Sequence, residues 1–130
     1  MIISEIVRPL ATIAAKMLPQ AASKLTSFPI QLVRRPNGAI GTQGVTIDQV
    51  ADVLYHVAGI KQATASMTMR ELVQLLASNP AAQQRLRASL QSNPIRIQKL
   101  PDGTYHILDG HHRLFLLNQL GDTTVPALIL

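Results

Sequence analysis

The chain has 130 residues, of which 47% are hydrophobic, and this composition predicts one packed globular domain rather than a disordered chain. It contains no cysteine, which excludes disulfides, thiol nucleophiles and cysteine-ligated zinc. The formal net charge of +5 favours anionic partners, while an aromatic content of 3% is too low for a surface that stacks single-stranded bases.

The first predicted element is an amphipathic helix near the N-terminus. Apolar residues recur there at helical spacing: Ile3, Ile6, Leu10, Ile13 and Met17. Pro9 kinks this helix or lies in its first turn, and Pro19 ends it. Its apolar side predicts packing on its own domain, with a protein partner or a homodimer as the alternative. The charges of Glu5, Arg8 and Lys16 argue against a signal peptide or a membrane span, so we expect a cytoplasmic protein.

The middle of the chain predicts a hairpin followed by three helices. Residues 29–44 indicate a strand, a turn at Pro36-Asn37-Gly38 and a weak return strand. Two helices are expected to begin at capping boxes, formed by Thr46 with Gln49 and by Thr68 with Glu71. A third is expected to begin with Pro80 at its first helical position, after Asn79.

The last third predicts a strand–strand–helix–strand unit. IRIQKL and YHILD alternate as strands around a turn at Pro101-Asp102-Gly103. A short helix, HHRLFLLNQL, follows and is capped by Gly121. TVPALIL is the final strand, and its Pro126 indicates an edge strand or an early strand position. The order of elements predicts the α+β class, with a small mixed sheet, a helical middle segment and this C-terminal unit.

The segment Asp109-Gly110-His111-His112-Arg113 is the most unusual feature, because it puts three potential cations at the positive end of a helix dipole. Gly110 allows the backbone to approach a ligand, and the first N–H groups of the helix lack partners. A phosphate bound there would reverse the unfavourable charge arrangement, and Arg113 offers a forked donor for its oxygens.

Two other interpretations of this box stay open on sequence alone. Asp109 could be an ordinary N-cap that pairs with Arg113, with both histidines solvated. Alternatively, a metal could be bound by His106, Asp109, His111 and His112, although no HExxH-like spacing is present. A divalent ion that arrives with a nucleotide and is held by Asp109 fits the pattern better than a dedicated metal cage.

A loose basic stretch without acidic residues precedes the box: Arg85, Arg87, Arg96 and Lys99. It predicts either a solvated surface or a face that contacts nucleic-acid phosphates.

Residues 94–130, PIRIQKLPDGTYHILDGHHRLFLLNQLGDTTVPALIL, resemble the core of the ParB/sulfiredoxin superfamily. The shared pattern is a strand, a turn, a strand that ends in a Gly-containing box, a helix and a VPALI-type strand. The helices expected within residues 68–91 match the helical segment before that core. We therefore expect a single domain over residues 1–130, with residues 66–130 as the superfamily-like core and residues 1–65 unassigned.

The resemblance implies a nucleotide whose phosphates lie on the box. Sulfiredoxins have a catalytic Cys where this chain has His111, which excludes sulfinic-acid repair, and the partition proteins have a GERR-type box for CTP. The closest box is the DGHHR of ParB-like free-serine kinases. That similarity implies phosphate contacts from Gly110, His111, His112 and Arg113, while Asp109 assists the acceptor hydroxyl or a metal ion.

The sequence therefore predicts a nucleotide-binding domain that performs NTP hydrolysis or phosphoryl transfer with ATP or ADP and Mg²⁺. Asp109, His111 and His112 are the expected catalytic residues, and neither Glu5 nor Glu71 is placed to be the Glu base of those kinases. One alternative is a DNA-binding or nuclease module, including a toxin domain of a secreted system. The other is a non-catalytic interaction domain that uses the N-terminal helix.

Overall fold

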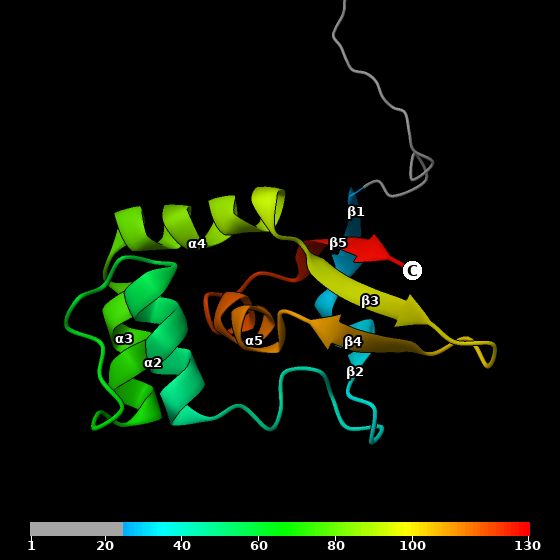
Figure 1. Cartoon of the computed structure of the whole chain (residues 1–130), viewed down its shortest axis with the longest axis horizontal. Coiled ribbons are helices and arrows are strands. Elements are labelled where there is room, and N and C mark those ends of the chain that lie inside the picture. The colour runs from blue at the N-terminus through cyan, green and yellow to red at the C-terminus, as the bar shows by residue number, and fades with distance from the viewer. Residues whose placement is uncertain (1–24) are drawn as a thin grey trace, which may run out of the picture.

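The structure is a computed structural model and describes residues 25–130 (Figure 1). The amphipathic helix predicted near the N-terminus lies outside the described residues. The described chain forms a mixed α+β fold with four α-helices and five strands. The helices are α2 (Ile47–His56), α3 (Met69–Ala77), α4 (Pro80–Ser92) and α5 (His111–Gln119). The strands are β1 (Leu25–Pro29), β2 (Val33–Arg34), β3 (Ile95–Lys99), β4 (Tyr105–Asp109) and β5 (Thr124–Ile129), and a 3-10 helix, η2 (Ile30–Leu32), joins β1 to β2.

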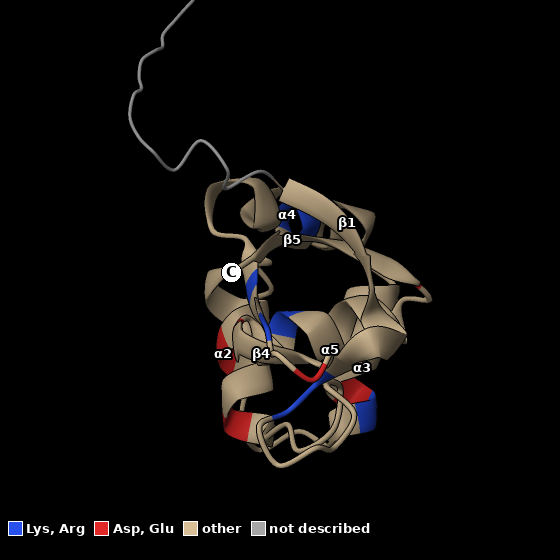
Figure 2. Cartoon of the chain, turned by 90° about the vertical axis from the view of Figure 1, so that its right-hand side faces the viewer, with Lys and Arg blue, Asp and Glu red and all other residues tan. Residues whose placement is uncertain are grey.

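The five strands form one mixed sheet in the order β1-β5-β3-β4-β2. β1 pairs with β5 and β3 with β4 in antiparallel fashion, whereas β3–β5 and β2–β4 are parallel pairs. The sheet curls, as the end-on view in Figure 2 shows. As a result the rings of Phe28 on β1 and Tyr105 on β4 lie 4.7 Å apart, although these strands are not neighbours.

Helix α5 lies between the pair α2 and α3 and the strands, whereas α4 runs past α5 and contacts β5 (Figure 1). Residues Arg113–Leu117 of α5 are all buried, which is the burial expected of a helix covered on every side. The core is mainly aliphatic, in keeping with the aromatic content of 3%, and includes Leu54, Leu72, Leu86, Ile95 and Leu116 at 0% exposure. The first turn of α5 is therefore attached to a rigid element.

The helix starts largely follow their caps. Thr68 and Glu71 form both halves of the predicted capping box, with hydrogen bonds of 3.1 and 2.8 Å. The Oγ1 atom of Thr46 accepts the N–H of Gln49 at 3.3 Å, so this box forms only its first half. Asn79 caps α4 through its side chain, with Pro80 at the start of the helix as predicted.

The structure corrects the predicted return strand and decides between the two positions expected for Pro126. The hairpin turn after Arg35 forms, but the return strand is reduced to one bridge between Arg34 and Ile40. β2 pairs instead with β4, a strand that only the tertiary fold brings close. β5 is not an edge strand, so of the two positions expected for Pro126 only the early strand position holds: Pro126 is the third of six residues. Its ring removes one donor, yet β5 pairs on both sides. Within residues 25–130, no helix has the combination of length and apolar character that a bilayer crossing requires.

Candidate functional site

The turn from β4 into α5 depends on Gly110, which is the N-cap of α5 with φ 97° and ψ 18°. This left-handed conformation favours glycine. A Cβ on Gly110 would also lie 2.3 Å from Ile95 Cδ1 and 3.2 Å from Arg113 Nη2. Because glycine has no side chain, no cap hydrogen bond reaches the first turn. The first N–H groups of α5 therefore have no acceptor within the helix, and no capping side chain accepts their hydrogen bonds.

Asp109 does not have the role of N-cap, so that interpretation of the box was wrong. It is the exposed last residue of β4 and lies opposite Arg96 in the sheet register. Within residues 25–130 it forms no ion pair with Arg113. Its carboxylate is close enough to oppose, in part, the lowering of the Arg113 pKa by burial. Asp109 therefore stands beside the first turn of α5 with its carboxylate exposed.

Arg113 is the buried cation of the site, with 6% of its surface exposed. Its Nη1 donates to the carbonyl oxygen of Asn93 and, at 3.5 Å, to that of Ser89, both at the C-terminal end of α4. A cation is favourable at that end of a helix dipole. Nη2 lies beneath Gly110, and among the described residues no carboxylate forms an ion pair with the guanidinium. Arg113 thus links the end of α4 to the start of α5.

The two histidines contact a distant segment, residues 35–46, which we call the strap. His111 Nε2 lies 2.5 Å from the carbonyl oxygen of Gln43, so this nitrogen is the donor. His112 Nε2 accepts the backbone N–H of Thr46 at 3.3 Å, so its proton is on Nδ1. The two rings lie 4.9 Å apart. Both histidines therefore hold the strap next to the start of α5.

Both histidines have a lowered pKa, chiefly because each ring is partly buried. The nearby Arg35 lowers both values further, and His111 also lowers the pKa of His112. The two rings are therefore largely neutral at pH 7. The sequence suggested three cations at the helix start, but Arg113 supplies the permanent charge in the box.

Arg35 is a site residue that the sequence did not single out. It lies on the strap, and its Nη1 donates to the carbonyl oxygens of Gln43 at 3.3 Å and Gly44 at 3.4 Å. It therefore shares the Gln43 carbonyl with His111. No motif or spacing connects residue 35 with residue 111, so only the folded strap reveals this neighbour.

The described residues do not form a dedicated metal centre. Within residues 25–130 there is no group of three or more His, Cys, Asp or Glu side chains that could hold a metal ion. The metal interpretation of His106, Asp109, His111 and His112 was therefore wrong. His111 and His112 instead use their Nε2 atoms on the strap. Asp109 stays the one carboxylate of the box that could contact an ion brought by a nucleotide.

No protein-family model, curated protein or solved structure matches the chain. The resemblance to the ParB/sulfiredoxin superfamily therefore stays a prediction.

The basic stretch is divided between helix α4, with Arg85 and Arg87, and strand β3, with Arg96 and Lys99. Arg85 Nε donates to the carbonyl oxygen of Ala58 at 2.8 Å, and Arg87 forms an ion pair with Asp122 at 2.8 Å. Arg96 and Lys99 are exposed on β3. All four side chains are exposed, but Arg85 and Arg87 have partners within the fold.

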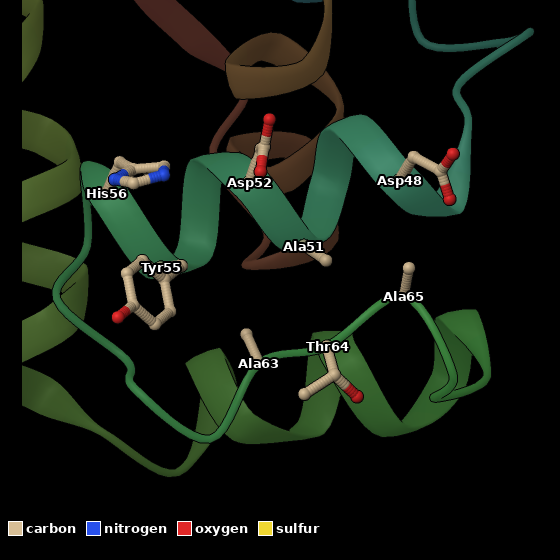
Figure 3. Close-up of a pocket in the computed structure, with 8 residues that line it drawn as sticks. All are labelled: Asp48, Ala51, Asp52, Tyr55, His56, Ala63, Thr64 and Ala65. Atoms are coloured by element: carbon tan, nitrogen blue, oxygen red, sulfur yellow. The ribbon is translucent and has the colours of Figure 1, made fainter.

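A separate hollow of about 440 Å³ lies between α2 and residues 63–65. Figure 3 shows its lining: Asp48, Ala51, Asp52, Tyr55, His56, Ala63, Thr64 and Ala65. Tyr55 and His56 are both exposed, and Lys61 Nζ lies 4.3 Å from the centre of the Tyr55 ring. Asp48 and Asp52 are exposed too. This hollow contains none of the box residues.

Proposed function

We propose that residues 109–113 bind the phosphates of a nucleotide, and that the domain hydrolyses the nucleotide or transfers its phosphoryl group. The main support is the buried Arg113 guanidinium beneath an uncapped helix start. Removing an ion from water costs several kcal/mol unless its charge is compensated. Carbonyl oxygens of α4 compensate Arg113 on one side only. A phosphate above Gly110 would compensate both the guanidinium and the helix dipole.

The groups around this position fit the needs of phosphoryl transfer. The N–H groups of His111 and His112 and the dipole of α5 would stabilise charge on the transferred group. Gly110 would let phosphate oxygens approach the backbone, since no side chain stands there. The neutral imidazole of His112, whose proton is on Nδ1, would add a hydrogen bond without permanent charge. Asp109 is exposed beside the box and would contact a Mg²⁺ ion that accompanies the nucleotide.

In hydrolysis, the oxygen of a water molecule would bond to the terminal phosphorus while the bond from phosphorus to the bridging oxygen breaks. The bridging oxygen keeps the electron pair and leaves as part of the nucleoside diphosphate. Asp109 would accept the proton of the attacking water, and a histidine of the box would orient that water. In transfer, an acceptor hydroxyl takes the place of the water and loses its proton to the same carboxylate.

The proposal is tested by titrating the protein with ATP, ADP, CTP and GTP in the presence of Mg²⁺. Backbone amide NMR should show shifts concentrated at Gly110–Arg113, and thermal melting should show stabilisation, which reaches about 2.7 kcal/mol at one hundred times the Kd. His106→Ala, on β4 outside the box, is the control that should bind normally. The absence of amide shifts with every nucleotide at millimolar concentration would overturn the proposal. Salt-dependent binding to duplex DNA without nucleotide binding would favour the nucleic-acid alternative instead.

A further inference from the structure

We propose that Arg35 is a second phosphate-binding residue, and that the ligand of this site has at least two consecutive phosphate groups. This inference rests on the proposed phosphate site and names the class of ligand that it takes. It begins from the strap, which His111 and His112 hold against the start of α5 through Gln43 and Thr46. A group on the strap is therefore part of the same site, although it lies far away in the sequence.

The position of Arg35 follows from a carbonyl oxygen that it shares with His111. The two donors lie 3.3 Å and 2.5 Å from Gln43 O, so the guanidinium is an immediate neighbour of the His111 ring. Gly44 makes room for this arrangement, because a Cβ there would lie 1.7 Å from Arg35 Nη1. Any larger residue at position 44 would displace the guanidinium from the strap.

The present partners of Arg35 leave it available to an anion. Its two hydrogen bonds are long, at 3.3 and 3.4 Å, and both acceptors are neutral carbonyls in an exposed setting. A phosphate oxygen is a stronger acceptor, since hydrogen bonds between two ions are shorter and roughly twice as strong. Within residues 25–130, neither Arg35 nor Arg113 forms an ion pair with a carboxylate. Both guanidinium groups therefore lack a neutralising partner in the described chain.

Two charges at two positions explain the expected ligand. The Arg113 guanidinium lies next to Gly110, whereas Arg35 lies on the strap and shares the Gln43 carbonyl oxygen with His111. One phosphate at Gly110 would neutralise the buried guanidinium and the helix dipole. A second phosphate, joined to the first, would extend past the histidines to Arg35. An oligophosphate thus matches this arrangement better than a single phosphate does.

The test compares Arg35→Ala with Arg34→Ala, a matched control on the neighbouring residue. Arg34 is also half-buried, and its Nη1 donates to the carbonyl oxygens of Gln31 and Val33, away from the histidines. The probes are inorganic phosphate, pyrophosphate and tripolyphosphate, with binding followed by calorimetry and by the amide signals of residues 110–113. Thermal melting of each variant verifies that it is folded.

We expect the unaltered protein to bind pyrophosphate and tripolyphosphate more tightly than phosphate. Arg35→Ala should weaken binding of these two by about tenfold or more, the loss typical of one charge-assisted hydrogen bond, and leave phosphate binding unchanged. Arg34→Ala should change none of the three affinities. If phosphate binds at residues 110–113 but the two variants behave alike, the role of Arg35 is refuted and the phosphate site stands. If no probe binds there, both proposals fail.

Discussion

Replacing Gly110 with alanine tests the strand-to-helix turn most directly. Alanine must adopt φ 97°, and its Cβ would lie 2.3 Å from the Cδ1 atom of Ile95. Ile95 is fully buried, so its side chain cannot move away into solvent. A left-handed residue costs roughly 1–2 kcal/mol and overpacking a core about 1–3 kcal/mol, so we expect a loss of about 2–5 kcal/mol.

The assay is urea unfolding of Gly110→Ala beside Gly103→Ala. Gly103 has nearly the same backbone, with φ 89°, but nothing lies within 4 Å of a Cβ there. The control should therefore lose only the conformational part, about 1–2 kcal/mol. The difference between the two variants measures how tightly the N-cap of α5 packs on Ile95. Equal losses would refute the reasoning, because they would mean that the Cβ at position 110 finds space.

Three further predictions concern neighbouring features. Arg113→Leu should destabilise the fold by about 1–3 kcal/mol in urea unfolding, because carbonyl oxygens at the end of α4 lose their donor. Arg96→Leu, at an exposed position, should change the stability little. Equal effects would contradict the role of Arg113 in holding the end of α4. Burial lowers the pKa of His111 and His112, so the stability that depends on neutral rings is complete above about pH 6.5 and is lost as the pH falls below it. Melting curves from pH 7.5 to 5 should show this loss. The double variant His111→Gln with His112→Gln should flatten the dependence of the melting temperature on pH. Thr68→Ala should cost about 1 kcal/mol by removing a complete capping box, whereas Thr26→Ala, exposed on β1, should be nearly neutral by the same assay.

Local interactions explain which elements the sequence predicted well. Thr68 with Glu71 and Asn79 with Pro80 mark helix starts through bonds that reach only three residues along the chain. The period-two alternation of Ile95 and Ile97 identified β3 for the same reason, since both side chains face one side of the strand. The glycine turn at Gly110 was also visible, although one interpretation of the box made Asp109, rather than Gly110, the N-cap.

What the sequence by itself determined, therefore, is the succession of helices and strands and a cation-rich turn at the start of a helix. Only the tertiary structure decided which residues stand around that turn. Gln43 and Thr46 meet His111 and His112 across 68 and 66 residues, and the Arg113 side chain reaches α4 across 20 residues. No local period records such contacts, because they depend on how the curled sheet and the buried helix α5 bring distant segments together. The same packing lets His111 and His112 hold the strap through hydrogen bonds, and it brings Arg35 next to His111.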